Sequence, residues 1–257
     1  MKQADREAVR YPGLEDRRVL VTGASSGLGE HFAKVFAGQG SHVFVAARRE
    51  EKVEGLASRI ISAGGRATAL RLDVSSSQSV SETLANLDLD VVINNAGTTV
   101  SKSALDHSGT EIDTIIDTNL KGVFHVAKAA AASMVARDIE GSIINVASIL
   151  GHRVAGHASA YAASKAAVLQ LTRALALEWA RYGVRVTALS PGYIETELNR
   201  DFFASEAGKA LIRRVPQRKL GQPEDLDGPI LLLASDLGRF MTGADIAVDG
   251  GHLVSSL

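Results

Sequence analysis

Short apolar runs alternate with longer amphipathic stretches along most of this chain. The apolar runs that predict strands lie at residues 18–21, 42–47, 67–72, 90–94, 141–147, 184–189 and 245–248. Between them, helices are predicted over residues 27–37, 50–62, 78–86 and 109–136, and over a segment that ends near residue 182. This regular alternation of strands and helices predicts an α/β fold with one open parallel sheet that is covered on both faces.

The alternation is interrupted between residues 193 and 215. Residues 199–215 have helical potential and contain Phe202 and Phe203, but they do not continue the strand-to-helix rhythm. Insertions at the carboxyl end of a strand commonly act as lids, so we expect a substrate lid at about residues 193–215. Residues 1–13 are charged and end in a Pro-Gly turn signal, which predicts a flexible lead-in before one catalytic domain over residues 14–257.

Composition narrows the classes of function. The 257 residues are 46% hydrophobic and 22% charged with a formal net charge of −1, so nothing favours binding to nucleic acid or to an anionic membrane. No apolar stretch is long enough to span a membrane. The absence of cysteine excludes disulfides and thiol catalysis, and together with the lack of a secretory signal pattern it predicts a cytoplasmic protein. The seven histidines form no metal-binding motif, so no metal site is expected.

A glycine-rich turn, Thr22-Gly-Ala-Ser-Ser-Gly-Leu-Gly29, follows the first predicted strand and opens a helix. Glycines let the backbone approach a ligand closely, and the free N–H groups of a helix N-terminus favour an anion. We therefore expect a dinucleotide pyrophosphate here. Asp73 ends the third strand, where a carboxylate can meet an adenine amino group, and the small residues 95–97 would let the same cofactor lie against the fourth strand.

Arg48 and Arg49 follow the second predicted strand, at a position that holds no Asp or Glu. In dinucleotide-binding folds an acid at this strand end holds the ribose 2′-hydroxyl group, whereas an arginine accommodates a 2′-phosphate. Guanidinium groups pair well with phosphate. The predicted cofactor is therefore NADP(H), with NAD(H) as the alternative.

Tyr161 and Lys165 are four residues apart on a predicted helix, so they lie on one face of it. A nearby cation favours phenolate, and we expect Lys165 to lower the pKa of Tyr161 toward the working pH. Ser148 follows the fifth predicted strand, where its hydroxyl could share a hydrogen bond with the oxygen that the tyrosine protonates. These three side chains are the predicted acid–base site.

The helix after Tyr161 carries Ala or Leu nearly all round, and residues 127–135 have the same character. A helix of this kind needs burial on several sides. The pattern predicts a subunit interface as well as a core, and hence a homo-oligomer.

The motifs occur in order and at the intervals of a known family. On Thr22-Gly-x-x-x-Gly-x-Gly29, Asn94-Asn-Ala-Gly97, Asn119, Ser148, Tyr161-x-x-x-Lys165 and Pro191-Gly192, the chain resembles the single-domain short-chain dehydrogenases/reductases over about residues 14–251. The resemblance implies a Rossmann fold with a doubly wound, mostly parallel seven-stranded sheet, and commonly a tetramer.

The resemblance also implies residue roles. Tyr161 would be the general acid/base, Lys165 would lower its pKa and contact the nicotinamide ribose, and Asn119 would help to hold a water in the proton relay to Lys165. Ser148 would orient the carbonyl or alcohol. Many NADP(H)-preferring members have a basic residue where this chain has Ser26, so the predicted cofactor preference rests mainly on Arg48. The expected cofactor-binding residues are Gly23, Ser25, Ser26, Gly27, Leu28, Arg48, Arg49, Asp73, Val74, Asn95, Ala96, Gly97, Tyr161, Lys165, Pro191, Gly192, Ile194 and Thr196.

The expected reaction is a reversible hydride transfer between a nicotinamide and a secondary alcohol or ketone. The predicted substrate pocket suits a partly apolar ketone or an acyl chain, which favours a carbonyl or 3-oxoacyl reductase. Residues 215–226 also resemble sugar-acid dehydrogenases such as gluconate 5-dehydrogenases, so an NAD(H)-dependent sugar-acid or polyol dehydrogenase is the alternative. A non-catalytic nicotinamide-binding regulator is a third hypothesis, against which the intact catalytic set argues. The predicted substrate residues are Ser148, Leu150, Val154, His157, Tyr161, Tyr193, Phe202 and Phe203.

Overall fold

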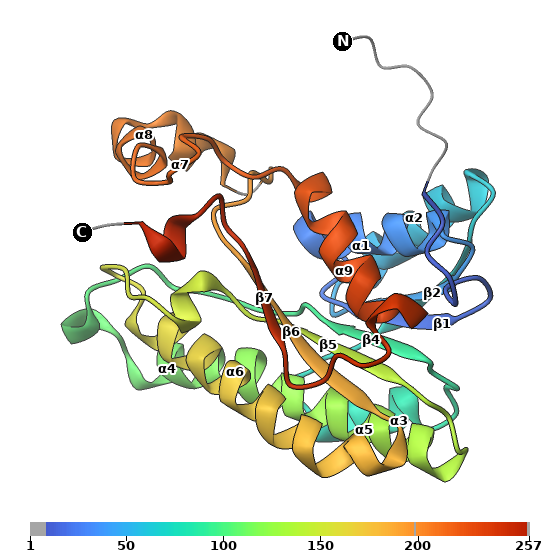
Figure 1. Cartoon of the computed structure of the whole chain (residues 1–257). Helices are drawn as coiled ribbons and strands as arrows, with labels where there is room; N and C mark the ends of the chain where they lie inside the picture. The colour runs from blue at the N-terminus through green and yellow to red at the C-terminus, as the bar shows by residue number, and fades with distance from the viewer. Residues whose placement is uncertain (1–8, 198, 256–257) are drawn as a thin grey trace, which may run out of the picture.

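Seven parallel strands form one sheet in the order β3-β2-β1-β4-β5-β6-β7 (Figure 1). The computed structural model describes residues 9–197 and 199–255. The strands are β1 (Arg18–Thr22), β2 (His42–Ala47), β3 (Arg66–Arg71), β4 (Val91–Asn94), β5 (Ser142–Val146), β6 (Arg185–Pro191) and β7 (Asp245–Val248). The predicted doubly wound α/β fold is confirmed. The strand order reverses between β1 and β4, which is the place where open α/β sheets bind ligands, at the carboxyl ends of the strands.

Helices cover both faces of the sheet (Figure 1). Clusters of buried apolar side chains fill the two spaces between sheet and helices, and neighbouring residues of one strand contribute to opposite clusters. On β1, Val19 and Val21 join Phe32 on one face, whereas Leu20 joins Val126 on the other. One face is covered by α1 (Gly27–Gly38), α2 (Glu50–Ser62) and α9 (Asp227–Ala234), and the other by α3 (Ser77–Leu84), α4 (Gly109–Ile116), α5 (Gly122–Ala136) and α6 (Ser159–Trp179).

The predicted helix over residues 109–136 is interrupted in the structure. A π-helical turn at Asp117–Lys121 separates α4 from α5. The fully buried Asn119 lies in this turn, and its side chain hydrogen bonds to the backbone of Thr98 and to the hydroxyl of Ser164. Single π-helical turns inside α-helices frequently occur at functional sites.

The segment expected to form a lid contains two short helices, α7 (Arg200–Ala204) and α8 (Glu206–Ile212). They lie apart from the two main helical layers, beyond the carboxyl end of β6 (Figure 1). A 3₁₀ turn at Pro223–Leu226 leads into α9. This segment therefore lies next to the edge of the sheet at which ligands bind in this architecture.

The described part of the N-terminal lead-in contacts the rest of the chain. The Gln39 side chain accepts a hydrogen bond from the N–H group of Tyr11 and donates one to the carbonyl of Val9, both at 2.9 Å. The other residues of the expected lead-in, 1–8, lie outside the described residues. Among the described helices, none has the length and apolar character that crossing a membrane requires.

Candidate active site

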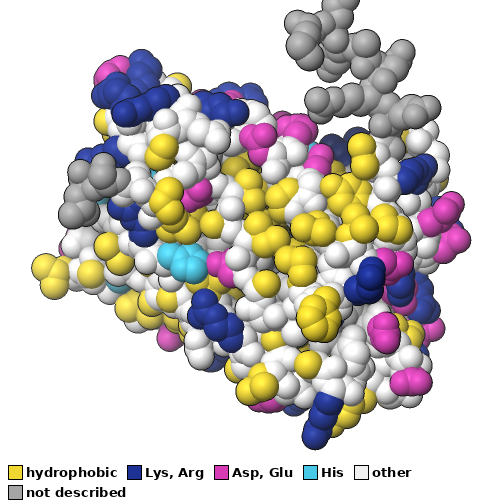
Figure 2. Space-filling model, viewed as in Figure 1, with side chains coloured by type: hydrophobic (Ala, Val, Ile, Leu, Met, Phe, Trp, Pro, Cys, Tyr) yellow, Lys and Arg dark blue, Asp and Glu magenta, His cyan; other side chains and the backbone are white. Residues whose placement is uncertain are grey.

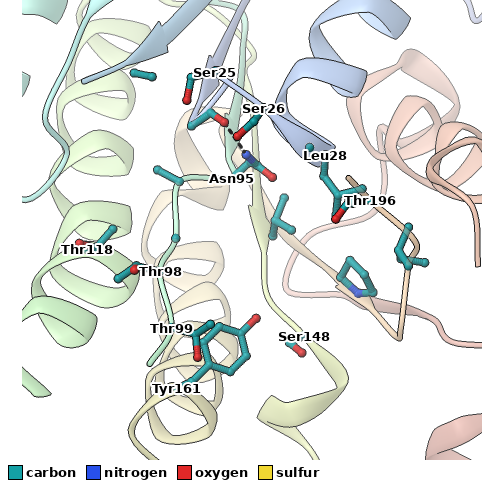
Figure 3. Close-up of a pocket in the computed structure, with 18 of the residues that line it drawn as sticks. Ser25, Ser26, Leu28, Asn95, Thr98, Thr99, Thr118, Ser148, Tyr161 and Thr196 are labelled. Atoms are coloured by element: carbon teal, nitrogen blue, oxygen red, sulfur yellow. Dashed lines mark hydrogen bonds between the residues drawn. The ribbon is translucent and has the colours of Figure 1, made fainter. Parts of the chain in front are cut away.

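A cavity of about 660 Å³ opens at the carboxyl ends of the central strands (Figure 3). Its walls come from segments that are far apart in the sequence, namely the turn before α1, the ends of β2 to β6, and α6. All the residues that the sequence predicted to bind the cofactor line this one cavity: Gly23, Ser25, Ser26, Gly27, Leu28, Arg48, Arg49, Asp73, Val74, Asn95, Ala96, Gly97, Tyr161, Lys165, Pro191, Gly192, Ile194 and Thr196. The fold brings the whole predicted set together.

The glycine-rich turn forms one end of the cavity. Gly23 has a φ of 66°, and a Cβ atom at this position would lie 2.7 Å from the Cα atom of Ala96, so only glycine fits. Ser26 precedes α1 in an extended conformation, and its side chain makes no capping hydrogen bond. The N–H groups of the first turn of α1 are thus left uncapped beside the cavity, an arrangement that suits a pyrophosphate.

Side-chain hydrogen bonds fix the glycine-rich turn against the end of β4. The hydroxyl of Thr22 accepts hydrogen bonds from the N–H groups of Asn95 and Ala96, both at 3.1 Å. The amide of Asn95 donates back to the carbonyls of Thr22 at 3.0 Å and Gly23 at 3.4 Å (Figure 3). These bonds hold both walls of the cavity in place without a ligand.

The end of the cavity near β2 is positively charged. Arg48 and Arg49 both line it, and the Arg49 guanidinium donates hydrogen bonds to the hydroxyls of Ser25 at 2.8 Å and Ser26 at 3.2 Å. Asp73 is the only acidic residue among the lining residues, and one of its carboxylate oxygens already accepts hydrogen bonds from the N–H and hydroxyl groups of Ser75. The groups present here match a phosphate better than a bare ribose hydroxyl.

The predicted acid–base side chains meet at the other end of the cavity. Tyr161 and Ser148 both line this end, and their hydroxyl groups lie near each other (Figure 3). Ser148 lies two residues after the end of β5, and its Oγ accepts a hydrogen bond from the N–H group of Leu150 at 3.1 Å. The Lys165 ammonium lies 5.7 Å from the centre of the Tyr161 ring and donates to the carbonyl of Val146 at 2.7 Å.

The pKa of Tyr161 shifts in the direction opposite to the one that the sequence led us to expect. We expected Lys165 to lower it, but burial raises the pKa of Tyr161 above its ordinary value, and the hydrogen bond from Ser148 opposes this effect. Burial also lowers the pKa of Lys165 to about 8. Desolvation dominates at both groups because Lys165 is buried and Tyr161 is half-buried.

Asn119 lies behind the cavity and does not line it. Its Oδ1 accepts a hydrogen bond from the N–H group of Thr98 at 2.8 Å, and its amide donates to the carbonyl of Thr98 at 2.9 Å and to Ser164 at 3.0 Å. Ser164 precedes Lys165 on α6 and donates to the carbonyl of Tyr161 at 2.7 Å. The side chain of Asn119 is therefore engaged in tying the loop after β4 to the helix that carries the acid–base pair.

The predicted substrate residues divide into two groups. Ser148, Tyr161, Tyr193 and Phe203 line the main cavity, whereas Leu150 and Val154 line a second, adjoining cavity. His157 and Phe202 line neither, and these two predictions are corrected. His157 has a positive φ of 61° in an exposed turn, and the half-exposed Phe202 packs on Phe203 with ring centres 5.2 Å apart. Local sequence could not show which way these side chains turn.

Four polar residues that the sequence analysis missed also line the main cavity: Thr98, Thr99, Thr118 and Asn199. Thr98 and Thr99 directly follow the small residues 95–97, so a longer motif window would have found them. Thr118 reaches the cavity because of the π-helical turn, and the side chain of Asn199 bridges Ile194 and Thr196 within the lid. No sequence signal indicated the last two.

The fold and this site define a nicotinamide-dependent oxidoreductase. The cavity joins a glycine-rich helix N-terminus at one end to a Ser–Tyr–Lys set at the other, and its volume lies within the range of ligand sites. The model of the family described as enoyl-(acyl carrier protein) reductase matches residues 23–252. The chain belongs to the short-chain dehydrogenase/reductase family, whose members are NAD(P)-dependent enzymes that act on alcohol and carbonyl groups.

Curated relatives and solved structures agree with this assignment. The chain is 38% identical over 250 residues to a 3β-hydroxysteroid dehydrogenase of Eggerthella lenta, with 94% of this chain and 95% of the relative covered. It is 34% identical over 246 residues to 2-dehydro-3-deoxy-D-gluconate 5-dehydrogenase of Escherichia coli, with 93% and 96% covered. A gluconate 5-dehydrogenase from Burkholderia cenocepacia, solved with NADP and tartrate, superposes with a TM-score of 0.90 at 34% identity, covering 96% of this chain and 98% of that one.

Proposed function

We propose that this protein is an NADP(H)-preferring oxidoreductase of the carbonyl or 3-oxoacyl reductase type, acting on secondary alcohols and ketones. The observation that carries the proposal is the meeting of Ser148, Tyr161 and Lys165 at one end of a cavity whose other end holds Arg48 and Arg49. When bound, the nicotinamide would supply the hydride in reduction and take it up in oxidation. The residues named above as the cavity lining would hold the cofactor.

In the reductive direction Tyr161 would donate its proton to the carbonyl oxygen as negative charge develops there. With its pKa above the ordinary value, the phenol of Tyr161 is protonated at neutral pH and has a proton to donate. The hydroxyl of Ser148, which lines the same end of the cavity, would donate to the same oxygen. A preorganised donor of this kind is worth several kcal/mol of transition-state stabilisation.

Lys165 would restore the proton on Tyr161. Its pKa of about 8 places the ammonium close to its titration point, where it can give up a proton to the phenolate and regain one at little cost. Asn119 would act as a positioning residue, because its hydrogen bonds to Thr98 and Ser164 fix the segment of α6 that carries Tyr161 and Lys165. The complete set argues against a non-catalytic nicotinamide-binding regulator.

The preference for NADP(H) is supported by Arg48 and Arg49 at the end of β2. A 2′-phosphate at this strand end would meet guanidinium groups and no acidic side chain other than Asp73. A relative whose structure contains NADP, the gluconate 5-dehydrogenase from Burkholderia cenocepacia, is consistent with this assignment. NAD(H) use belongs to the second candidate function, a sugar-acid or polyol dehydrogenase, which the gluconate-type relatives favour.

The central test is Tyr161→Phe. The variant keeps the ring and its packing, so we expect NADPH binding within about twofold of the wild type, measured by the change in nicotinamide fluorescence. Turnover on aliphatic ketones, β-keto esters and keto-sugar acids should fall by at least about 10²–10⁴-fold, because acid–base assistance is lost. Tyr182→Phe, at an exposed position outside the cavity, is the matched control. Near-normal turnover in Tyr161→Phe would overturn the assignment.

We also propose a homotetramer in the cytoplasm. Large apolar side chains remain exposed on the described surface, among them Leu177 on α6 and Phe240 after α9, at 84% and 101% of full exposure. Isolated exposed residues are ordinary, but α5 and α6 also carry exposed apolar side chains such as Phe124 and Val135 on α5. Light scattering coupled to size-exclusion chromatography measures the oligomer, and a monomeric mass would contradict the proposal.

A further inference from the structure

A second cavity of about 1010 Å³ adjoins the active site. Both cavities share Tyr193 as a common wall. The second one also borders the turn at Ile149–Gly151, which begins directly after Ser148, and the N–H group of Leu150 is hydrogen bonded to the Ser148 hydroxyl. The second cavity therefore lies beside the place that a substrate would occupy with its oxygen against Ser148 and Tyr161.

The second cavity is strongly basic. Four arginines line it, Arg153, Arg213, Arg214 and Arg218, and no Asp or Glu is among its lining residues. Within the part of the chain that the structure describes, no carboxylate lies within 4.0 Å of the guanidinium groups of Arg213, Arg214 or Arg218. Most arginines on a protein surface face a mixed-charge environment, whereas these four surround one hollow. Figure 2 shows Lys and Arg side chains gathered over the α7 and α8 region (upper left).

The arginines come from two separated segments that the fold brings face to face. Arg153 follows β5 and donates hydrogen bonds to the carbonyl of His252 and, at 2.9 Å, to the hydroxyl of Ser255. The other three follow α8, in a loop attached to the turn after β7 by the hydrogen bond from the N–H group of Gln217 to the carbonyl of Gly250 at 3.2 Å. The cluster is thus held between the lid and the body of the domain.

The guanidinium groups of Arg153 and Arg214 act electrostatically on Tyr193 and His252, which line the second cavity. Tyr193 and His252 lie with ring centres 5.3 Å apart. Burial raises the pKa of Tyr193, with Arg214 and Arg153 opposing this, and burial together with the same two arginines lowers the pKa of His252. Two guanidinium groups therefore favour negative charge at this wall, which lies beside the predicted position of the reacting carbon.

We propose that the second cavity binds an oxyanion of the substrate, a carboxylate or a phosphate, while the carbonyl of the same molecule lies against Ser148 and Tyr161. Guanidinium forks bind both kinds of oxyanion by paired hydrogen bonds. The apolar side chains of Leu150, Leu211 and Pro216 line the same cavity and would contact the chain that links the two groups. The phosphates of the cofactor would bind elsewhere, because Arg48 and Arg49 lie at the opposite end of the main cavity.

This inference rests on the proposed function and makes it more specific, since the substrate becomes an anionic oxo or hydroxy compound. Its test compares matched substrates. Oxo acids of increasing length, from 4-oxopentanoate to 8-oxononanoate, are assayed with NADPH beside their neutral methyl esters. Alkyl phosphates of similar length serve as competitive inhibitors, to separate phosphate from carboxylate recognition. We expect kcat/KM to favour the acid over its ester by about 10- to 100-fold at the best length, mainly through KM.

The variants are Arg214→Gln and Arg214→Lys, with Arg239→Gln as the control at the opposite, amino-terminal edge of the sheet. Arg214→Gln should raise KM for the preferred acid by about 10-fold or more while leaving kcat/KM for the ester within about twofold, which also shows that the variant is folded. Arg214→Lys keeps a charge and should recover part of the loss, and Arg239→Gln should match the wild type.

The outcomes separate the two proposals. Turnover of esters and acids with equal efficiency, unaffected by Arg214→Gln and not inhibited by alkyl phosphates, would overturn the anion site but leave the reductase function intact. No turnover of either class, with NADPH bound, would overturn the proposed function first. Inhibition by alkyl phosphates but not by alkyl carboxylates would assign the site to phosphate, and the reverse result would assign it to carboxylate.

Discussion

The sharpest physical prediction concerns the buried ammonium of Lys165. This side chain is 4% exposed, and among the described residues its hydrogen-bond acceptor is the carbonyl of Val146. Burial lowers its pKa from the model-compound value of 10.5 to about 8. A shift of this size makes the charged form roughly 3 kcal/mol less favourable in the folded protein than in the unfolded chain. Lys165 therefore costs stability wherever it is protonated.

The sign of the pH effect follows from proton binding. Between about pH 8 and pH 10.5 the unfolded chain holds more protons at Lys165 than the folded protein does, so the stability of the wild type rises with pH over this window. Below about pH 8 both states are protonated and the contribution of Lys165 is constant. The substitution Lys165→Met removes this titration and keeps the length of the side chain.

The assay is urea unfolding of wild type and Lys165→Met at pH 7, 8, 9 and 10. The difference in the free energy of unfolding should move by roughly 2–3 kcal/mol in favour of the wild type from pH 7 to pH 10. The absolute difference at pH 7 also contains the lost hydrogen bond to Val146, so the change with pH is the quantity that tests the reasoning. Lys52→Met, at an exposed position on α2, should show a pH-independent difference. A pH-independent difference for Lys165→Met as well would refute the desolvation argument.

Three further predictions test the cofactor site and the fold. Gly23→Ala forces a Cβ atom to 2.7 Å from Ala96 at a φ of 66°. NADPH affinity, measured by titration, should fall by at least about 10-fold, and stability, measured by thermal unfolding, by about 1 kcal/mol or more. Unchanged NADPH binding would contradict this geometry. Arg48→Gln should weaken NADPH by about 10- to 100-fold and leave NADH within about twofold in parallel titrations, whereas equal losses would assign Arg48 to another role. Asp90→Asn should destabilise the protein by about 1–3 kcal/mol at pH 7, because three nitrogen atoms of Arg18 donate to this nearly buried carboxylate. Burial raises the pKa of Asp90, but hydrogen bonds from the side chain and backbone of Arg18 outweigh this and lower it. The advantage of the wild type should therefore begin to shrink as the pH falls below about 4, and an advantage that is undiminished at pH 3 would contradict the shift.

Regular elements and sequential motifs were predictable from the sequence because both are local. Apolar runs predict strands, and the periodic patterns between them predict helices. The seven strands of the structure begin and end within two residues of their predicted bounds. The glycine-rich turn could be assigned for the same reason, since Gly23 must adopt a positive φ wherever the strand turns into the helix. The spacing of Tyr161 and Lys165 on one helix likewise placed both at the same cavity.

Properties that depend on contacts between distant segments required the tertiary structure. The pKa of Tyr161 rises because several elements bury it together. The four-residue spacing to Lys165 could not predict this effect. The π-helical turn at Asn119 depends on partners from the loop after β4 and from α6. The sequence placed His157 in the substrate pocket, but its turn carries it away from both cavities.

The basic second cavity is the clearest case of this division. The sequence by itself supplied Arg153 and the arginines after α8, and nothing in their spacing showed that they would surround one hollow. The strand order of the sheet, the lid that follows β6 and the turn after β7 bring these segments together, because each is attached to a different part of the fold. Sequence therefore determined the reaction class through local motifs, and tertiary structure decided the charge of the cavity that would receive the rest of the substrate.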